Sequence, residues 1–452
     1  MYIIGIYTFL ILSYIASRIF PSDILSYSVG IIAVLALVIS LRKASVLYLK
    51  TGLIFLLFGC FLFIYHQLPW YTFFLHFESM LGLLSFFYLL PFIQSLIRTG
   101  HFDTHLNRLI YLNTTRLSKL YFKSSLVSHM LGIFLNVAAI PVLIRSLDLS
   151  LRDIPDEIKN RFYTSSILRA FALCLTWSPL EALVGIAIDA TGVQYASVFL
   201  ITFLTAILFI LASWIVFTRS TNMELPKPTV QLYGSKVNLL QKKIVHFLMI
   251  LVMFAITVSL VNSITGFGFL FSIVLVAVPF SLVTAVFMKK IKQYLTIAIP
   301  LWRSRVEGLS DYFFMFLSAG FFVEMISQTK WVLGLRLFLV DAAYYSRLIF
   351  YLFVGIYFLV ASLAGFHQLV SLVLLLRILD PVIGQLEPIP FTLVLISCSI
   401  VSAMYSPYSV SVSLMASEIR VSPYRITRWN LGFASCYMLF CIVLAYFLGF
   451  FM

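Results

Sequence analysis

The sequence predicts an all-α integral membrane protein with about 11 transmembrane helices, two re-entrant helical hairpins and two inverted repeats that each contain a broken helix. Three observations support this prediction. Of the 452 residues, 62% are hydrophobic and only 11% are charged, a composition typical of a polytopic membrane bundle. Apolar runs of spanning length recur along the chain. A Ser-Pro pair interrupts two of them, at Ser178-Pro179 in the first half of the chain and at Ser406-Pro407 in the second.

The apolar runs predict eleven spans. The first is apolar from its start and lacks a basic leader and a small-residue cleavage site, so we expect a retained span rather than a signal peptide. Two further apolar stretches, 120–147 and 344–379, are too long for one span and too short for two, and we expect them to form re-entrant hairpins. The spans lie near 2–17, 26–41, 51–66, 80–97, 164–189, 195–217, 245–263, 267–288, 310–327, 390–416 and 429–451.

The Lys and Arg residues predict the orientation. With a cytoplasmic N-terminus, the inner segments carry 26 of the 31 basic residues, as the positive-inside rule requires. The net charge of +14 then reflects loops beside an anionic leaflet, and no nucleic-acid partner is needed to explain it. We therefore expect a multi-pass protein of the plasma (inner) membrane. Its inner segments are 42–50, 98–123, 145–169, 219–243, 289–305 and 420–428.

The same orientation makes the repeats inverted, because the first hairpin opens to the cytoplasm and the second opens to the outside. The predicted organisation has five parts. They are N-terminal scaffold spans (1–77), a first repeat (78–217, with hairpin 120–147 and broken helix 164–190), a cytoplasmic linker (218–244), a second repeat (245–428, with hairpin 344–379 and broken helix 390–416) and a C-terminal span (429–452).

Enzyme chemistry has no support in the sequence. The five cysteines all fall in apolar segments without metal-ligand spacing, and they are expected to be small buried hydrophobic residues. No glycine-rich nucleotide loop, metal cluster or nucleophile elbow is found. We therefore expect no catalytic residue, no metal site and no organic cofactor.

Each Ser-Pro pair is expected to end one helix and begin another at mid-membrane depth. Proline disrupts a helix that is already under way, yet it is favoured at the first position of a new one, and Ser is favoured just before it. Irregular backbone at that depth persists only inside protein or beside a water-filled cavity. Two such breaks at matching places in two halves indicate the binding site of a transporter.

This arrangement resembles the ion transporter superfamily, which includes the divalent-anion/sodium symporters and the large membrane subunits of TRAP transporters. The resemblance covers roughly residues 80–415 and implies a secondary active transporter with a scaffold and a transport domain, an elevator-like motion and a homodimer. The segments that carry it are LNVAAIP (135–141) and TWSPLEALVG (176–185) in the first half, and GFHQLVS (365–371) and SAMYSPYSVSVS (402–413) in the second.

The hairpin tips depart from the family pattern. The symporters carry Ser-Asn-Thr at each tip, where it contributes to sodium and carboxylate binding. Here the first tip keeps only Asn136, and the second offers His367, Gln368 and Ser371. Proton coupling is accordingly our first hypothesis and sodium coupling the second.

The expected substrate is a small anionic, carboxylate-like solute. Half-helices that begin inside the membrane direct free amides and a positive dipole end at the cavity, which suits an anion. Beside Asn136, His367, Gln368 and Ser371, the candidate binding residues are those of the two breaks. The alternative is that each Ser-Pro pair only kinks a packed helix. The residues of the breaks are Thr176, Ser178, Pro179, Glu181, Ser406, Pro407 and Ser409.

Two interpretations remain open for each polar side chain. Glu181 is costly at membrane depth and could carry a coupling proton, yet its spacing from Ser178 also fits a capping box. His367 could change charge near physiological pH or simply be a satisfied hydrogen-bonding residue. Asn136 and Gln368 could bind an ion or solute, or could hold a tight turn.

The composition is also compatible with two functions other than transport. A multi-span cell-envelope enzyme, such as a polysaccharide polymerase or lipid-linked glycosyltransferase, is similarly apolar, but it usually exposes a large charged outer loop. The outer connections here are short and carry few charges. A membrane subunit that only anchors a partner would tolerate mutation at both Ser-Pro pairs.

Overall fold

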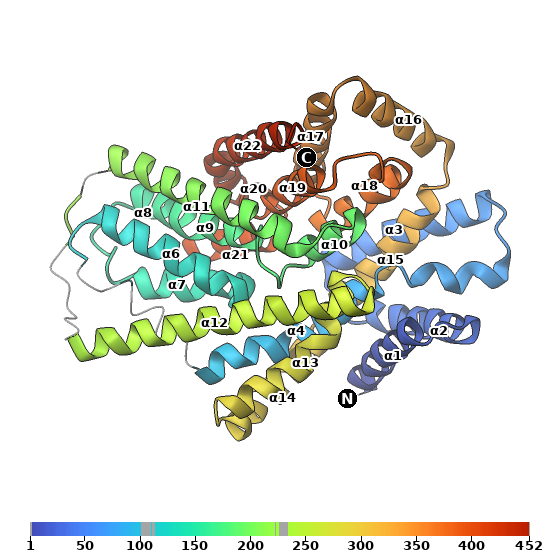
Figure 1. Cartoon of the computed structure of the whole chain (residues 1–452), viewed down its shortest axis with the longest axis horizontal. Coiled ribbons are helices and arrows are strands. Elements are labelled where there is room, and N and C mark those ends of the chain that lie inside the picture. The colour runs from blue at the N-terminus through green and yellow to red at the C-terminus, as the bar shows by residue number, and fades with distance from the viewer. Residues whose placement is uncertain (1, 101–109, 111–113, 222, 226–233, 452) are drawn as a thin grey trace. The chain divides into compact units, whose positions relative to one another are not determined.

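The computed structural model describes residues 2–100, 110, 114–221, 223–225 and 234–451. Over these residues the chain is helical and forms no β-strand (Figure 1). In this part of the chain, ten helical segments are long and apolar enough to cross a membrane. There are 11 when α14 (Ile291–Glu307) and α15 (Ser310–Ile326), which meet at 54°, count as one broken span. The predicted all-α, multi-pass membrane fold is confirmed.

The chain folds into two compact units, and each unit takes segments from both halves of the sequence. Unit 1 comprises Met1–Leu96, Leu260–Asp341 and Val373–Val382, and unit 2 comprises Ile97–Ser259, Ala342–Leu372 and Ile383–Met452. Unit 1 contains α14, α15 and the helices α1 (Tyr2–Ile19), α2 (Asp23–Leu41), α3 (Val46–Tyr65), η1 (Trp70–Phe77), α4 (Leu81–Gly100), α13 (Phe269–Phe287) and α16 (Lys330–Tyr345).

Unit 2 contains the first hairpin, the first arm and the tip of the second hairpin, and the broken helices of both halves, while most of α18 (Gln368–Ile383), the return arm of the second hairpin, belongs to unit 1. Most of α12 (Gly234–Thr265) and the start of α18 also belong to unit 2. From the first half it takes α6 (Leu117–Leu135), η2 (Asn136–Ala138), α7 (Ala139–Leu147), α8 (Asp156–Tyr163), η3 (Thr164–Leu168), α9 (Arg169–Leu175), α10 (Ala182–Thr191) and α11 (Tyr195–Ser220). From the second half it takes α17 (Arg347–Leu363), α19 (Pro388–Ile400), α20 (Ser402–Tyr405), α21 (Val410–Ile419) and α22 (Pro423–Leu448).

In unit 1, α3 and α15 pack closely because two glycines face two phenylalanines. A Cβ atom at Gly52 would lie 2.6 Å from the ring of Phe314, and one at Gly59 would lie 2.7 Å from the ring of Phe321. Both pairs repeat after seven residues, which is close to two helical turns, so the contact continues along both helices. Side chains larger than glycine at these positions would push the helices apart.

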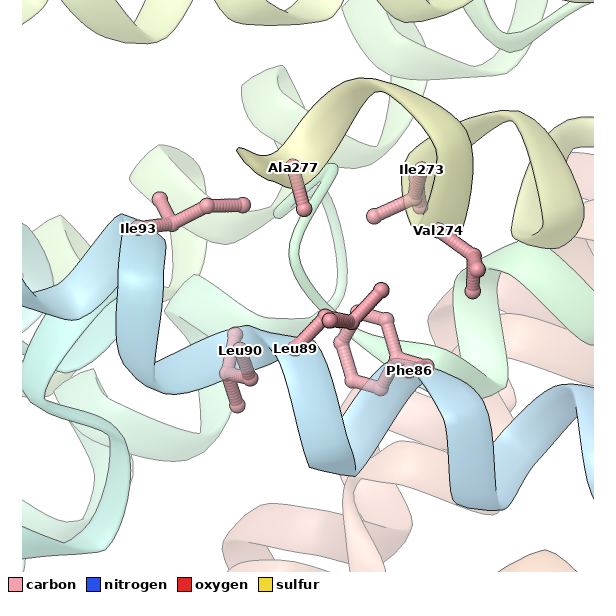
Figure 2. Close-up of a pocket in the computed structure, with 7 residues that line it drawn as sticks. All are labelled: Phe86, Leu89, Leu90, Ile93, Ile273, Val274 and Ala277. Carbon is pink, nitrogen blue, oxygen red and sulfur yellow. The ribbon is translucent and has the colours of Figure 1, made fainter. Parts of the chain in front are cut away.

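A narrow gap between α4 and α13 of unit 1 has only apolar walls (Figure 2). Binding sites for charged solutes need a few convergent polar groups, and this gap provides none. All residues predicted for the binding site belong instead to unit 2. The gap is lined by Phe86, Leu89, Leu90, Ile93, Ile273, Val274 and Ala277.

The first hairpin of unit 2 is recognised from the direction of the helices beside it. Ser128 of α6 donates a hydrogen bond to the carbonyl of Ile167 at 2.8 Å. Further along, a Cβ atom at Gly132 would lie 2.6 Å from the Sγ atom of Cys174. Residue numbers thus rise together along α6 and the η3–α9 segment, and these helices run parallel. The chain between them, which contains α7, must therefore turn back.

The second half of unit 2 repeats this geometry. Phe350 of α17 packs on Phe391 of α19 with ring centroids 5.8 Å apart. Near the other end of α17, Ser406 donates to the carbonyl of Ser362 at 2.8 Å. The two helices again run parallel, so the chain between them returns through α18. Each hairpin turns at a residue with positive φ: Asn136 at 51° and Gly365 at 95°.

The ends of the two halves correspond when residue numbers in the first half are shifted by the constant offset between Ser178 and Ser406. With this offset the range of α10 matches that of α21, both of 10 residues, and the range of α11 matches that of α22, both of 26 residues. The offset also relates the left-handed C-caps of the two short helices, Gly192 (φ 69°) and Arg420 (φ 55°). The two Ser-Pro pairs therefore belong to equivalent structural positions.

The two broken helices run in opposite directions through unit 2. Thr191, the last residue of α10, has its Oγ1 atom 2.6 Å from that of Thr392, near the start of α19. At the other end, α21 contacts η3, which precedes α9. In the middle, α9 and α20 contact each other. The breaks that follow these two helices therefore lie in the same central region of unit 2.

Three segments expected to be loops are helical. The inner segments 289–305 and 145–169 contain α14 and α8, and the outer connection after residue 327 contains α16. Their charged residues excluded them from a search for uninterrupted apolar runs, which does not detect short or charged helices. Arg108 and Lys227, counted on the inner side, lie outside the described residues, as do parts of the predicted linker 218–244. The proposed repeat boundaries stay a prediction.

Candidate functional site

The first break, residues 176–181, separates α9 from α10. Thr176 is the C-cap of α9, and its hydroxyl donates to the carbonyl of Leu173 at 2.8 Å. The chain then turns, and the amide of Leu180 donates to the hydroxyl of Ser178 at 3.2 Å. Both hydroxyls are buried. Their interactions with the local backbone stabilise the break, as expected for polar groups at membrane depth.

Glu181 is the N-cap of α10, which begins at Ala182. The prediction that the new helix starts at Pro179, with Ser178 as N-cap and Glu181 three residues inside, is therefore wrong. The side chain of Glu181 lies beside the backbone amides of Ala182 and Leu183, and Glu181 is only 8% exposed. No ion pair with Glu181 is present among the described residues, and the positive end of the α10 dipole lies beside this carboxyl group.

His129 and Trp177 connect the first hairpin to the first break. His129 of α6 is fully buried, and its Nε2 atom accepts a hydrogen bond from Trp177 Nε1 at 2.9 Å. Its Nδ1 atom lies 3.0 Å from the carbonyl of Ala170. Because Nε2 accepts, the proton of the neutral imidazole is on Nδ1 and is donated to that carbonyl. Tyr195 of α11 also donates to the carbonyl of Trp177, at 2.6 Å.

The second break, residues 406–409, separates α20 from α21. Ser406 has an extended backbone and ends α20, and Pro407 is buried after it. Ser409 is the N-cap of α21 and accepts from the amide of Val412 at 3.2 Å. The new helix thus begins at Val410, three residues later than predicted. The prediction was wrong in the same way at both breaks. The helices end before the prolines as expected, but the new helices begin only after Glu181 and Ser409, which have extended backbone.

At the second hairpin tip, Gln368 approaches the second break. Its Oε1 atom accepts a hydrogen bond from Ser402 of α20 at 2.8 Å. His367 precedes α18, and its Nδ1 atom accepts from the amide of Leu369 at 3.3 Å, as a helix cap does. Ser371 is buried, and its carbonyl accepts from the hydroxyl of Tyr357 at 2.9 Å.

Asn136 forms the turn of the first hairpin. Its Oδ1 atom accepts from the amide of Val137 at 2.7 Å, and its backbone, with φ 51° and ψ −139°, lies outside the left-handed helical region in a conformation that favours glycine. The turn that it begins, η2, contacts α21. The structure therefore brings the first hairpin tip to the half-helix that follows the second break.

Arg169 and Asn430 form a polar link that sequence reasoning missed. The Arg169 guanidinium donates through Nε to Asn430 Oδ1 at 2.8 Å and lies 4.4 Å from the ring centroid of Phe433. Asn430 is fully buried, and its Nδ2 atom donates to the carbonyl of Met404 at 3.0 Å. This link ties α9 of the first half to the end of α20, directly before the second break.

The comparisons concern the fold. No protein-family model and no curated protein matches the chain. The YdaH transporter of Alcanivorax borkumensis aligns with a TM-score of 0.56 and 15% sequence identity over 83% of this chain and 86% of YdaH. The fold is similar to that of YdaH. MtrF of Neisseria gonorrhoeae, described as illuminating a class of antimetabolite efflux pumps, aligns at a TM-score of 0.46 and 11% identity over 82% of this chain and 81% of its own.

The fold of this chain thus places two helix N-termini and several hydroxyls in one compact unit. Such a site can bind an anion or a small cation, or carry a proton on Glu181. In the described part of the chain, no group of three or more His, Cys, Asp and Glu residues that could hold a metal ion occurs.

Proposed function

We propose that the protein is a secondary active transporter that moves a small anionic, carboxylate-like solute across the membrane. One observation carries the proposal: two half-helices, α10 and α21, begin at equivalent interior positions of antiparallel broken helices. Inverted repeats with discontinuous helices are a recurring architecture of carriers, whose substrate and ion sites lie at the breaks. The similarity in fold to the YdaH transporter agrees with this function.

The N-terminus of α21 is our proposed anion site. The N-terminus of α10 already faces the carboxyl group of Glu181, whereas α21 is capped by the neutral Ser409. The Ser409 hydroxyl accepts from the amide of Val412, which leaves the amides of Val410 and Ser411 for a solute. Ser406 and Pro407 fix the backbone before this end, and Gln368 supports the preceding helix.

Alternating access is proposed to occur by an elevator-like movement, with unit 2 as the transport domain. This assignment follows from the location of both breaks in unit 2. Hydrogen bonds within unit 2 support each break: Trp177 donates to His129 at the first, and Asn430 donates to the carbonyl of Met404 before the second. A homodimer in the inner membrane, with its N-terminus in the cytoplasm, completes the proposal.

Coupling to protons or sodium is proposed to drive uphill transport. Glu181 is the acidic residue of the two breaks and would carry the proton. The alternative ion, sodium, needs oxygen ligands, and both breaks contain hydroxyl groups.

The test is counterflow in proteoliposomes. Purified protein is first screened for thermal stabilisation by a panel of small carboxylates, because a ligand stabilises the state that it binds. Liposomes loaded with each stabilising anion should then accumulate the radiolabelled anion faster than protein-free liposomes. A chain that is stabilised by none of the anions and shows no counterflow with any of them would not be this transporter.

A further inference from the structure

A cluster of buried polar side chains lies beside the first break. The phenol of Tyr437, on α22, lies next to the hydroxyls of Thr176, Thr205 and Ser397. The thiol of Cys441 lies next to the last two hydroxyls and the same phenol. These five residues, which we name the hydroxyl cluster, are each at most 4% exposed. They come from the end of α9 and from α11, α19 and α22, all within unit 2.

The oxygens of this cluster are arranged as acceptors. Thr176 and Thr205 each donate to a carbonyl three residues earlier in their own helix, at 2.8 and 2.9 Å, so their lone pairs stay available. The hydroxyls of Ser397 and Tyr437 are enclosed and have no hydrogen-bond partner in the described part of the chain. The two enclosed hydroxyls need a partner, since an unpaired buried hydroxyl costs about 1–3 kcal/mol, and the neighbouring oxygens of Thr176 and Thr205 can share that partner.

The local electrostatics favour a cation of single charge. Thr176 caps the C-terminus of α9, where the helix dipole presents its negative end. Neutral oxygens are hard ligands that suit alkali ions, and the absence of a carboxylate from the cluster disfavours calcium and magnesium. Half-helix C-termini and unwound carbonyls are also the groups that coordinate sodium in inverted-repeat carriers.

The equivalent position in the other half of the chain already contains a positive charge. The offset that relates the two halves pairs Ser397 with Arg169 and Cys441 with Ser213. The Arg169 guanidinium donates to the Ser213 hydroxyl at 3.3 Å and to the carbonyl of Trp429 at 3.0 Å, both of which are neutral partners. One half thus holds a tethered cation among neutral oxygens. In the other half, the equivalent residue Ser397 has a short neutral side chain, so a cation from solution would have to supply the positive charge.

We propose that Thr176, Thr205, Ser397 and Tyr437 form a binding site for a sodium ion. The site is separate from the hairpin tips and is closed in this conformation, so sodium enters only when unit 2 opens. Bound sodium would hold the end of α9 against α19 and α22. As a coupling site this inference rests on the proposed transport function, but sodium binding itself can be measured without transport.

The test measures thermal unfolding of the purified full-length protein in sodium, potassium or choline chloride at equal ionic strength. Sodium should raise the melting temperature over choline, with a saturating concentration dependence. Ser397→Ala and Tyr437→Phe should each weaken the apparent sodium affinity by about tenfold or more, equivalent to about 1.4 kcal/mol. Thr205→Val has nearly the same shape as the wild type, and its apparent sodium affinity provides a third test if the Ser397 or Tyr437 variant does not fold.

The matched controls are Ser124→Ala and Tyr351→Phe. Both remove a buried hydroxyl of unit 2 that also lacks a hydrogen-bond partner in the described residues, but neither belongs to the cluster. They should keep the sodium response. An equal melting temperature in sodium and choline, as an ordered water in the cluster would give, overturns the proposal, and so does an unchanged response in Ser397→Ala. If counterflow occurs but sodium does not change the melting temperature, the proposed transport function stands and only the proposed sodium site is contradicted.

Discussion

Glu181 and Ser409 occupy equivalent positions in the two halves of the chain, and each is the N-cap of a 10-residue half-helix in unit 2. One is a carboxylic acid and the other an alcohol. A carboxylate at an N-cap offsets the partial positive charge of the helix end, whereas a hydroxyl leaves most of it. The two halves therefore share one backbone but differ in charge at the point where a solute or ion would bind.

Ser409→Asp should abolish anion transport without unfolding the protein. Asp is as good an N-cap as Ser but cannot donate the hydrogen bond that the Ser409 hydroxyl gives to the carbonyl of Ser406 at 3.0 Å, so the melting temperature should fall only modestly. The added carboxylate would compensate the end of α21 as Glu181 does at α10, and it would repel an anionic solute. Counterflow of the best stabilising carboxylate should fall at least about tenfold, which corresponds to about 1.4 kcal/mol.

The matched control for this substitution is Ser346→Asp. Ser346 caps α17 and accepts from the amide of Ile349 at 3.5 Å, so it has the same structural role outside the breaks. It should leave both stability and counterflow nearly unchanged. Normal counterflow in Ser409→Asp would show that the anion does not use the end of α21.

Glu181→Gln should remove the effect of a proton gradient on uptake. Glutamine has nearly the same shape but cannot release a proton, so the exchange of solute down its own gradient should persist while pH-jump uptake is lost. The measurement is uptake into proteoliposomes with and without an imposed pH gradient. Glu157→Gln, in an exposed pair with Arg161 at 3.2 Å, is the control. If the variant remains fully pH-driven, Glu181 is not the coupling residue.

The breaks could be predicted from sequence because proline has a local effect. The clash of Pro179 and Pro407 with the preceding turn needs no tertiary information, and both helices do end before them. The restart of each helix could not be predicted in this way. Ser178 is the favoured N-cap of the Ser-Pro-Leu-Glu stretch, yet α10 begins after Glu181, so the packing of the half-helix rather than local preference sets its start.

The polar links of unit 2 could not be predicted because their partners are remote in sequence. His129 meets Trp177 after 48 residues, and Arg169 meets Asn430 after 261. A signal was present, since His129 is an ionisable residue within an apolar segment and such residues warrant a search for partners. Arg169 was instead counted as a charge of a cytoplasmic loop, and its place in α9 is visible only in the fold.

Asn136→Gly separates a structural role of this side chain from a binding role. Glycine adopts the positive φ of 51° freely, so the turn should form with little loss of stability. Because Asn136 bonds to the amide of Val137, we expect the variant to keep counterflow within about twofold, or about 0.4 kcal/mol. Asn136→Val, which resists this backbone conformation, should lower the melting temperature. Loss of counterflow in a stable Asn136→Gly variant would instead assign Asn136 to the solute or ion.

His129 and Trp177 should show strong coupling in a double-mutant cycle. His129→Phe leaves the indole N–H of Trp177 buried without an acceptor, and Trp177→Phe leaves Nε2 without a donor. Each single change should cost about 1–3 kcal/mol of unfolding free energy. The double variant should cost less than the sum, by about 0.5–3 kcal/mol, because neither polar atom is then left without its partner. Additive losses, measured by unfolding in detergent, would contradict a direct hydrogen bond.

Asn430→Ala and Arg169→Lys should both destabilise unit 2. The alanine removes the donor to Met404 and the acceptor from Arg169 at once, which should cost about 2–3 kcal/mol of unfolding free energy for these buried groups. Lysine keeps the charge of Arg169 but cannot reproduce its three directed hydrogen bonds or its contact with an aromatic ring. Arg145→Gln breaks a pair whose arginine side chain is 77% exposed, so it should change stability by less than about 1 kcal/mol. Arg169→Lys with wild-type stability would mean that charge alone, rather than the guanidinium geometry, holds α9 against the end of α20.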